Sequence, residues 1–121
     1  MDSTNRGRWG EDIAANHLQT EGYTLIEQNW RYKKLEIDLI VCTQKLWVFV
    51  EVKTRKIGYL ESALDAVDLR KQQRIVKAAH QFICRSSKHP SRDVRFDIVC
   101  IEYDRSNWRI QHIIDAFISL P

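Results

Sequence analysis

Hydrophobic positions recur along the chain with two periods, one typical of helices and one typical of strands. Apolar residues return every three or four positions through residues 3–21 and again through residues 68–86, which predicts two amphipathic helices. Runs rich in β-branched and aromatic residues predict strands. These runs cover residues 23–30, 35–42, 46–53, 94–101 and 108–114. The element order is α-β-β-β-α-β-β, which predicts an α/β fold with a mixed central sheet flanked by helices and a right-handed crossover.

Short polar signals predict where these elements end. Ser3 or Thr4 can cap the first helix, and Gly22 stands where a C-terminal glycine belongs. Asp68 can cap the second helix in the same way. The segment 43–45 separates the two strongest strands, so these strands are predicted to form a hairpin.

Charged residues inside the two strongest strands interrupt the apolar pattern. Alternation along the later strand places Glu51 and Lys53 on one face together with Trp47. A two-residue turn at 44–45 sets a register in which Asp38 falls directly opposite Glu51. A three-residue turn would shift this register by one residue.

Two carboxylates that face each other across a covered sheet repel each other and are costly to desolvate. The predicted site therefore needs a positive partner, and two candidates remain. One is Lys53, and the other is a hard divalent cation such as Mg²⁺, which binds carboxylate oxygens. A third interpretation is ordinary: Glu51 and Lys53 form a solvated pair at a strand end, and Asp38 is half-exposed.

The second helix carries two further signals. Gln72 lies near the centre of its apolar stripe, in the first turn, from which it could reach the same pocket as Lys53. The alternative is an exposed glutamine at a frayed end. On the opposite face, Arg70, Arg74 and Lys77 form a row that could follow phosphates or could simply be solvated.

The charge distribution favours a polyanionic partner. The net charge is only +3, but residues 53–95 hold eleven Lys and Arg against four Asp and Glu. A basic surface of this kind favours nucleic acid. The 121 residues fit a single domain, predicted over 1–121.

The remaining composition argues for a cytoplasmic protein that does not enter a membrane. The longest apolar run, residues 46–50, is far too short to span a bilayer, and the N-terminal segment has no signal-peptide core. Cys42, Cys84 and Cys100 have no C-x-x-C spacing, so they are predicted to be reduced residues of the core.

Asp38 followed after twelve residues by Glu51-Val52-Lys53 resembles the signature of the PD-(D/E)XK nuclease superfamily. Longer segments are more specific and occur in order. They are GRWGEDIAANHL, EGY, NWR, EIDLI, VFVEVKTR, AVDLRKQQR and RFDIV. Together they resemble the small bacterial YraN-like family, also called UPF0102, over about residues 6–117.

This resemblance implies a restriction-endonuclease-like core, similar to Holliday junction resolvases, and a metal-dependent nuclease. Asp38 and Glu51 match the metal-binding acids, with the carbonyl of Val52 as a further ligand of Mg²⁺ or Mn²⁺. Lys53 matches the lysine that orients or activates water. The implied reaction is hydrolysis of phosphodiester bonds in nucleic acid, most of all DNA, with structure-directed or weak sequence specificity. Resolvase-like relatives often pair, so the resemblance also allows a homodimer.

Other positions match the family less centrally. Glu11 matches an acid on the first helix of resolvase-like members, and Gln72 belongs to the KQ pair that opens the second long helix. Leu35 stands where the family usually has glycine, and Ile37 replaces the proline of the superfamily name, but neither change removes a ligand. Six basic residues are expected to bind nucleic acid. They are Arg55, Lys56, Arg70, Lys71, Arg74 and Lys77.

Two other classes of function fit the same sequence. A non-catalytic protein could use this fold and its basic face to bind nucleic acid or a partner. A structural scaffold would do neither.

Overall fold

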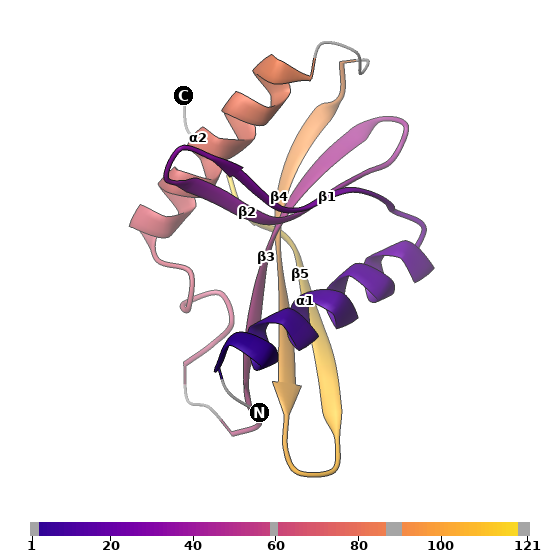
Figure 1. Cartoon of the computed structure of the whole chain (residues 1–121), viewed down its shortest axis with the longest axis vertical. Helices are drawn as coiled ribbons and strands as arrows, with labels where there is room; N and C mark the ends of the chain where they lie inside the picture. Colours follow the sequence, from indigo (N-terminus) through magenta and orange to yellow (C-terminus); the bar gives the residue numbers. More distant parts are fainter. Residues whose placement is uncertain (1–2, 59–60, 87–90, 119–121) are drawn as a thin grey trace.

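The computed structural model describes residues 3–58, 61–86 and 91–118. It confirms the predicted order of elements and the α/β class (Figure 1). The elements are α1 (Ser3–Thr20), β1 (Thr24–Tyr32), β2 (Leu35–Cys42), β3 (Leu46–Lys56), α2 (Leu69–Arg85), β4 (Asp93–Tyr103) and β5 (Trp108–Phe117). The strands form one five-stranded sheet in the order β1-β2-β3-β4-β5. Only the β3–β4 neighbours run parallel, so the sheet is mixed, as predicted.

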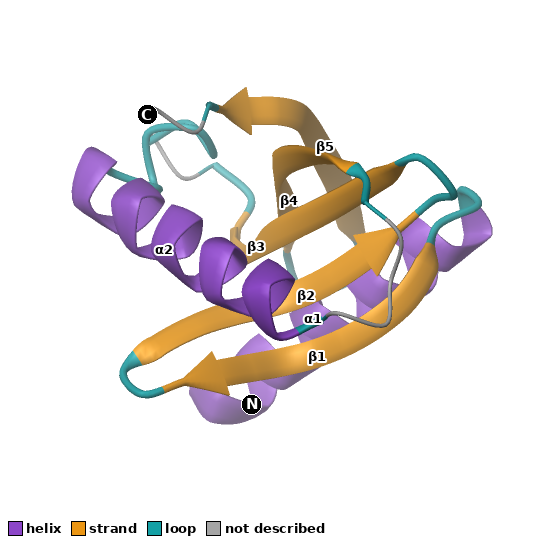
Figure 2. Ribbon diagram, turned by 90° about the horizontal axis from the view of Figure 1, so that it is seen from above, coloured by secondary structure: helices purple, strands orange, loops and turns teal. Residues whose placement is uncertain are grey.

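The two helices cover opposite faces of this sheet (Figure 2). Ala14, Ala15 and Leu18 of α1 pack on alternate strand residues such as Val48 and Val50. The other residues of β3 in this alternation, Trp47 and Phe49, face α2. They pack with Ile75, Ala79 and Phe82. The period-two pattern of β3 thus builds two apolar layers, one under each helix.

The predicted caps that fall on described side chains are present. Oδ1 of Asp68 accepts a hydrogen bond from the N–H of Lys71 at 2.8 Å, so Asp68 is the N-cap of α2. Gly22 adopts a φ of 101°, and the N–H of Tyr23 bonds to the carbonyl of Leu18. This Schellman arrangement needs the left-handed conformation that glycine supplies. The side chains of Ser3 and Thr4 lie outside the described residues.

The β2–β3 hairpin has the predicted register. Cys42 pairs with Trp47 and Leu39 pairs with Val50, as a two-residue turn requires. The ladder between β2 and β3 stops at this last pair, whereas β3 and β4 stay paired from Leu46 to Lys56. Asp38 and Glu51 therefore stand at the point where two neighbouring strands separate.

The cysteine prediction is partly wrong. Cys42 and Cys100 are buried free thiols, but Cys84 is exposed on α2 because it lies off the helix face that contacts the sheet. Burial raises the pKa of the Cys100 thiol. Among the described helices, neither is long and apolar enough to cross a bilayer.

Candidate active site

Asp38 and Glu51 form a carboxylate pair at the point where β2 and β3 separate. Glu51 is only 5% exposed, and Asp38 is half-buried. Oδ2 of Asp38 accepts a hydrogen bond of 2.8 Å from the backbone N–H of Val52. The side chains of Asp38 and Glu51 are adjacent, and the negative charge of Asp38 opposes the ionisation of Glu51. The predicted convergence of these two acids is present.

The electrostatics of the pair follow from burial and from mutual repulsion. Burial raises the pKa of Glu51 to about 8, and the neighbouring charge of Asp38 adds to this rise. Burial also raises the pKa of Asp38. Lys71 and Lys53 oppose the shift at Glu51, but they do not cancel it. The pair therefore retains a proton near neutral pH.

Lys71, which was predicted to bind nucleic acid, forms an ion pair with Glu51. Its Nζ lies 3.6 Å from Oε1 of Glu51, while its side chain stays 45% exposed. The sequence grouped Lys71 with phosphate-binding residues, because helical periodicity does not tell how far a long side chain reaches. Lys53 is half-buried on the same face of β3, and its positive charge favours the ionised form of Glu51. Two amines therefore flank one buried carboxylate.

Glu11 approaches Asp38 from α1. Its side chain is half-buried and hydrogen-bonds to Asn29. Burial raises the pKa of Glu11, and the charges of Asp38 and Glu36 act in the same direction. The structure therefore places Glu11 within electrostatic range of Asp38, on the side of the sheet opposite α2.

Sequence reasoning missed Asn29. Gln28 pairs with Leu39 and Trp30 with Ile37, so Asn29 occupies the position on β1 opposite Asp38. Its φ is 55°, in the left-handed region where asparagine is one of the few tolerated non-glycine residues. An asparagine inside a strand was the available signal, since asparagine is uncommon in strands.

Gln72 is half-buried at the start of α2, and its Nε2 donates to the carbonyl of Val67 at 2.9 Å. This bond stabilises the segment that enters the helix. Its predicted role in orienting water stays a prediction.

The predicted nucleic-acid contacts divide into two groups. The Arg55 side chain is only 12% exposed, lies 3.7 Å from Glu102 and donates to the carbonyl of Glu61. It therefore already has protein partners. The other predicted contacts are exposed, and Arg74 also donates to the carbonyl of Lys34 at 3.2 Å. These exposed residues are Lys56, Arg70, Lys71, Arg74 and Lys77.

A second buried carboxylate, Asp97 on β4, shows what full compensation looks like. It is completely buried, and it accepts two bonds of 2.8 Å from Arg95 and one of 3.0 Å from the N–H of Asp115. Nε2 of His112 lies 2.7 Å from its Oδ2. Burial alone would raise the pKa of Asp97, but these hydrogen bonds outweigh it and lower the pKa.

The carboxylates of Asp38 and Glu51 are the oxygen donors that the pair offers to a metal ion. Within the described parts of the chain, no group of three or more His, Cys, Asp or Glu side chains is arranged to hold a metal. Oxygen donors suit Mg²⁺ or Mn²⁺, and Mg²⁺ commonly needs only one or two carboxylates because water and substrate phosphate complete its shell. The donor set at Asp38 and Glu51 fits such an ion.

Comparison with known proteins gives one consistent relationship. Residues 10–101 match the model of the family described as "Uncharacterised protein family UPF0102". A UPF0102 protein of Flavobacterium johnsoniae is 41% identical over 113 residues, which cover 92% of each chain. One from Chlorobium chlorochromatii is 41% identical over 117 residues, covering 92% of this chain and 89% of the relative. One from Porphyromonas gingivalis is 38% identical over 118 residues, covering 96% and 86%.

Proposed function

Because the chain belongs to the UPF0102 family and carries an under-compensated carboxylate pair, we propose that it is a Mg²⁺- or Mn²⁺-dependent nuclease. Its reaction is the hydrolysis of phosphodiester bonds in nucleic acid, with DNA as the principal substrate. The observation that carries this proposal is the convergence of the buried Glu51 and the half-buried Asp38 where β2 and β3 separate, with Lys53 on the same face as Glu51, in a site where one further cation would be stabilising.

The contrast with Asp97 supports the need for a cation. The same chain satisfies Asp97 with an arginine, a histidine and a backbone N–H, and its pKa falls. At Asp38 and Glu51, burial outweighs the compensating groups, because the two acids have only nearby amines and one backbone N–H as partners. A structural ion pair is expected to look like Asp97, whereas a functional site commonly holds strongly perturbed carboxylates.

Asp38, Glu51 and the carbonyl of Val52 would hold the ion. When bound, such an ion lowers the pKa of a coordinated water and neutralises charge on the scissile phosphate. The half-buried Lys53 would hold or deprotonate the attacking water, or bind the phosphate. Glu11 approaches from α1 and would act as a further acid beside the pair.

The surrounding residues would bind and orient the substrate. Lys71 neutralises Glu51 in the free protein, and its 45% exposed side chain can turn to a phosphate. Gln72 would orient a water or a ligand from the first turn of α2. The exposed row Arg70, Arg74 and Lys77 would contact backbone phosphates, which position a substrate but read no sequence. We therefore infer structure-directed or weakly sequence-specific binding.

One observation favours a second candidate, a nucleic-acid-binding protein without catalysis. Glu51 already has Lys71 as a counter-ion at 3.6 Å. In this alternative, the paired acids and amines are structural, and the basic face of α2 alone carries the function.

A cleavage assay separates the two candidates. Single-stranded, duplex, flap and branched DNA are incubated with Mg²⁺ or Mn²⁺ and the wild type, Asp38→Asn or Lys53→Ala. The nuclease proposal expects metal-dependent cleavage that falls at least about 100-fold in both variants. Asp65→Asn removes an exposed carboxylate of the loop before α2 and serves as the matched control.

A second readout does not depend on activity. Mg²⁺ is expected to raise the Tm of the wild type and of Asp65→Asn, but not of Asp38→Asn. DNA binding that survives in both site variants, with no cleavage by the wild type, would replace the nuclease with the binding protein.

A further inference from the structure

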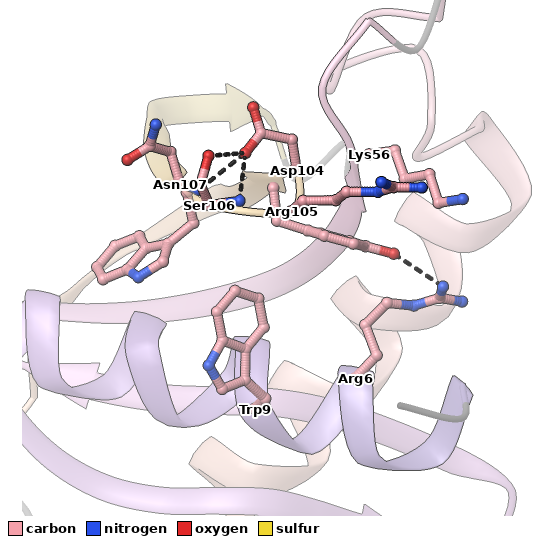
Figure 3. A pocket seen from close by; sticks show the side chains of 9 residues that line it. Arg6, Trp9, Lys56, Asp104, Arg105, Ser106 and Asn107 are labelled. Atoms are coloured by element: carbon pink, nitrogen blue, oxygen red, sulfur yellow. Dashed lines mark hydrogen bonds between the residues drawn. The ribbon is translucent and has the colours of Figure 1, made fainter.

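A pocket of about 500 Å³ lies on the α1 side of the sheet, away from the carboxylate pair (Figure 3). Arg6 and Trp9 line it from the first half of α1, Lys56 lines it from the end of β3, and Arg105 lines it from the β4–β5 turn. This volume is within the range of small-ligand sites. The family motifs and the carboxylate site leave this pocket unassigned.

Aromatic rings form its floor and one wall. Trp9 meets Tyr103 edge-on at 6.0 Å between ring centroids and meets Trp108 at 6.3 Å. Trp108 is 50% exposed, although it is a large apolar side chain on an edge strand. The rings of Trp9 and Trp108 are nearly perpendicular, at 88°, and this contact helps to hold Trp108 in place while its ring stays accessible. A flat, exposed, supported ring of this kind is a stacking platform for a nucleobase.

Positive charge surrounds the rings. Nη1 of Arg6 donates to the hydroxyl of Tyr103 at 2.9 Å, which fixes one guanidinium at the pocket. Lys56 and Arg105 are exposed, and neither has an ion pair with another described residue. Three cations beside aromatic rings form the combination that binds a nucleotide, because phosphate and base are recognised together.

The acid in the pocket, Asp104, forms hydrogen bonds within its own turn. Asp104 accepts hydrogen bonds from the N–H groups of Ser106 and Asn107 at 2.9 and 2.8 Å. The N–H of Asp104 in turn bonds to the carbonyl of Asn107. The turn that carries Arg105 and leads into Trp108 is therefore held by its own hydrogen bonds.

The pocket and the candidate active site share β3. Lys53 and Lys56 are three residues apart, about 10 Å along an extended strand, and their side chains leave opposite faces. That separation equals about three nucleotide steps at a 3.4 Å rise. A strand held at the carboxylate pair could therefore reach the pocket only after a few nucleotides, past the C-terminal end of β3.

From this geometry we infer that Arg6, Lys56, Arg105 and Trp108 form a binding site for an unpaired nucleotide of a single-stranded segment. The inference rests on the proposed nuclease function and specifies its substrate class as DNA with a single-stranded end or branch beside the cleaved bond. Duplex DNA cannot offer an unstacked base to Trp108, so it binds less tightly.

Binding is measured without catalysis, by fluorescence anisotropy of a labelled oligothymidylate and of a matched duplex with wild-type protein in EDTA. The wild type is expected to bind the single strand more tightly than the duplex. Trp108→Ala is expected to weaken single-strand binding by about 5- to 150-fold, the range of one lost base stack. Trp108→Phe keeps a ring and is expected to retain most of the affinity, which separates stacking from folding.

The basic residues of the pocket are tested against a basic residue outside it. Lys56→Ala and Arg105→Ala are each expected to weaken binding several-fold and to flatten its salt dependence. Lys45→Ala removes an equal charge from the turn before β3, at the opposite end of that strand from Lys56, and is expected to leave binding unchanged. Folding of each variant is checked by its far-UV circular dichroism.

The outcomes distinguish the two proposals. Single-strand binding that depends on Trp108, without any metal-dependent cleavage, supports this inference and overturns the nuclease. Cleavage of branched DNA by a Trp108→Ala variant that binds single strands like the wild type overturns this inference and leaves the nuclease intact. Equal affinity for single strand and duplex, or no binding of the single strand, also overturns it.

Discussion

The backbone N–H of Val52 donates a 2.8 Å hydrogen bond to the side chain of Asp38, beyond Leu39 and Val50, the last paired residues of β2 and β3. In a regular antiparallel ladder this N–H would bond to a carbonyl of the neighbouring strand. Here a carboxylate takes that place, so the backbone of β3 fixes the orientation of Asp38 next to Glu51. The sheet itself, rather than a loop, thereby holds the two acids together.

The first prediction concerns stability and pH. Burial raises the folded-state pKa of Glu51 to about 8 from an ordinary value of 4.5, so the folded protein binds more protons than the unfolded chain between these values. In the metal-free protein, the contribution of Glu51 to the free energy of unfolding is therefore fully present below about pH 4.5 and is lost as the pH rises toward 8. Glu51→Gln is expected to flatten this dependence and to stabilise the protein at pH 8.

Urea unfolding at pH 5 and pH 8 checks this result. Glu27→Gln, which changes an exposed carboxylate on β1, is the control and should keep the slope of the wild type. A Glu51→Gln variant with the same pH slope as the wild type would contradict the burial of an unsatisfied carboxylate.

The second prediction compares two glycines of α1. A Cβ on Gly10 would lie 1.9 Å from Oγ1 and 3.2 Å from Cβ of Thr54, because the helix crosses β3 closely there. Gly10→Ala is therefore expected to cost about 1–3 kcal/mol. Gly7 has no atom within 4 Å of such a Cβ, so Gly7→Ala is expected to stabilise the helix by up to about 1 kcal/mol.

Chemical denaturation of both variants gives the two free energies of unfolding. The double variant Gly10→Ala/Thr54→Ala removes the hydroxyl that clashes and should recover part of the loss. Equal effects at positions 7 and 10 would contradict the close crossing of α1 and β3.

The third prediction concerns Asp97. The substitution Asp97→Asn would leave the guanidinium of Arg95 without its carboxylate, so it is expected to cost about 3 kcal/mol. The lowered pKa of Asp97 also sets a pH dependence: its contribution is present above the ordinary pKa of 3.8 and is lost as the pH falls through the folded value.

Acid unfolding followed by circular dichroism tests both parts. Asp97→Asn should remove part of the loss of stability that the wild type shows below pH 4. Asp65→Asn, on the exposed loop, should unfold like the wild type.

The fourth prediction separates the two roles of Asn29. Asn29→Gly accepts the φ of 55° but loses the side chain that hydrogen-bonds to Glu11, whereas Asn29→Ala loses both. We expect the alanine variant to be less stable than the glycine variant by about 1 kcal/mol. In both, the pKa of Glu11 should rise further, because the hydrogen bond from Asn29 lowers it.

NMR titration of the Glu11 carboxyl group measures this pKa, and urea unfolding measures the stability. A Glu11 pKa that is unchanged in both variants would show that Asn29 does not orient this acid.

The sequence predicted the features that depend on local chemistry. The cap at Asp68, the glycine at 22 and the hairpin register each follow from a few neighbouring residues, and the structure confirms them. The convergence of Asp38 and Glu51 followed from that register alone. These features depend on backbone geometry, which has few alternatives.

Side-chain reach and long-range packing were not predictable in this way. The ion pair of Lys71 with Glu51 depends on how α2 docks after the crossover, and that of Arg55 with Glu102 depends on the β3–β4 register. The left-handed conformation of Asn29 and its hydrogen bond to Glu11 of α1 are not revealed by periodicity. Each of these contacts joins segments that are distant in sequence.

The early end of the β2–β3 ladder divides the molecule mechanically. The paired residues of β2 in its ladder with β3 run from Leu39 to Cys42, whereas β3 is paired with β4 along its full length. Local opening should begin at this seam, so amide protons near Asp38 exchange with solvent before those in the β3–β4 centre. The proposed catalytic acids Asp38 and Glu51 thus lie at the boundary between the β3–β4–β5 part of the sheet and the β1–β2 hairpin, which has fewer residues paired with it.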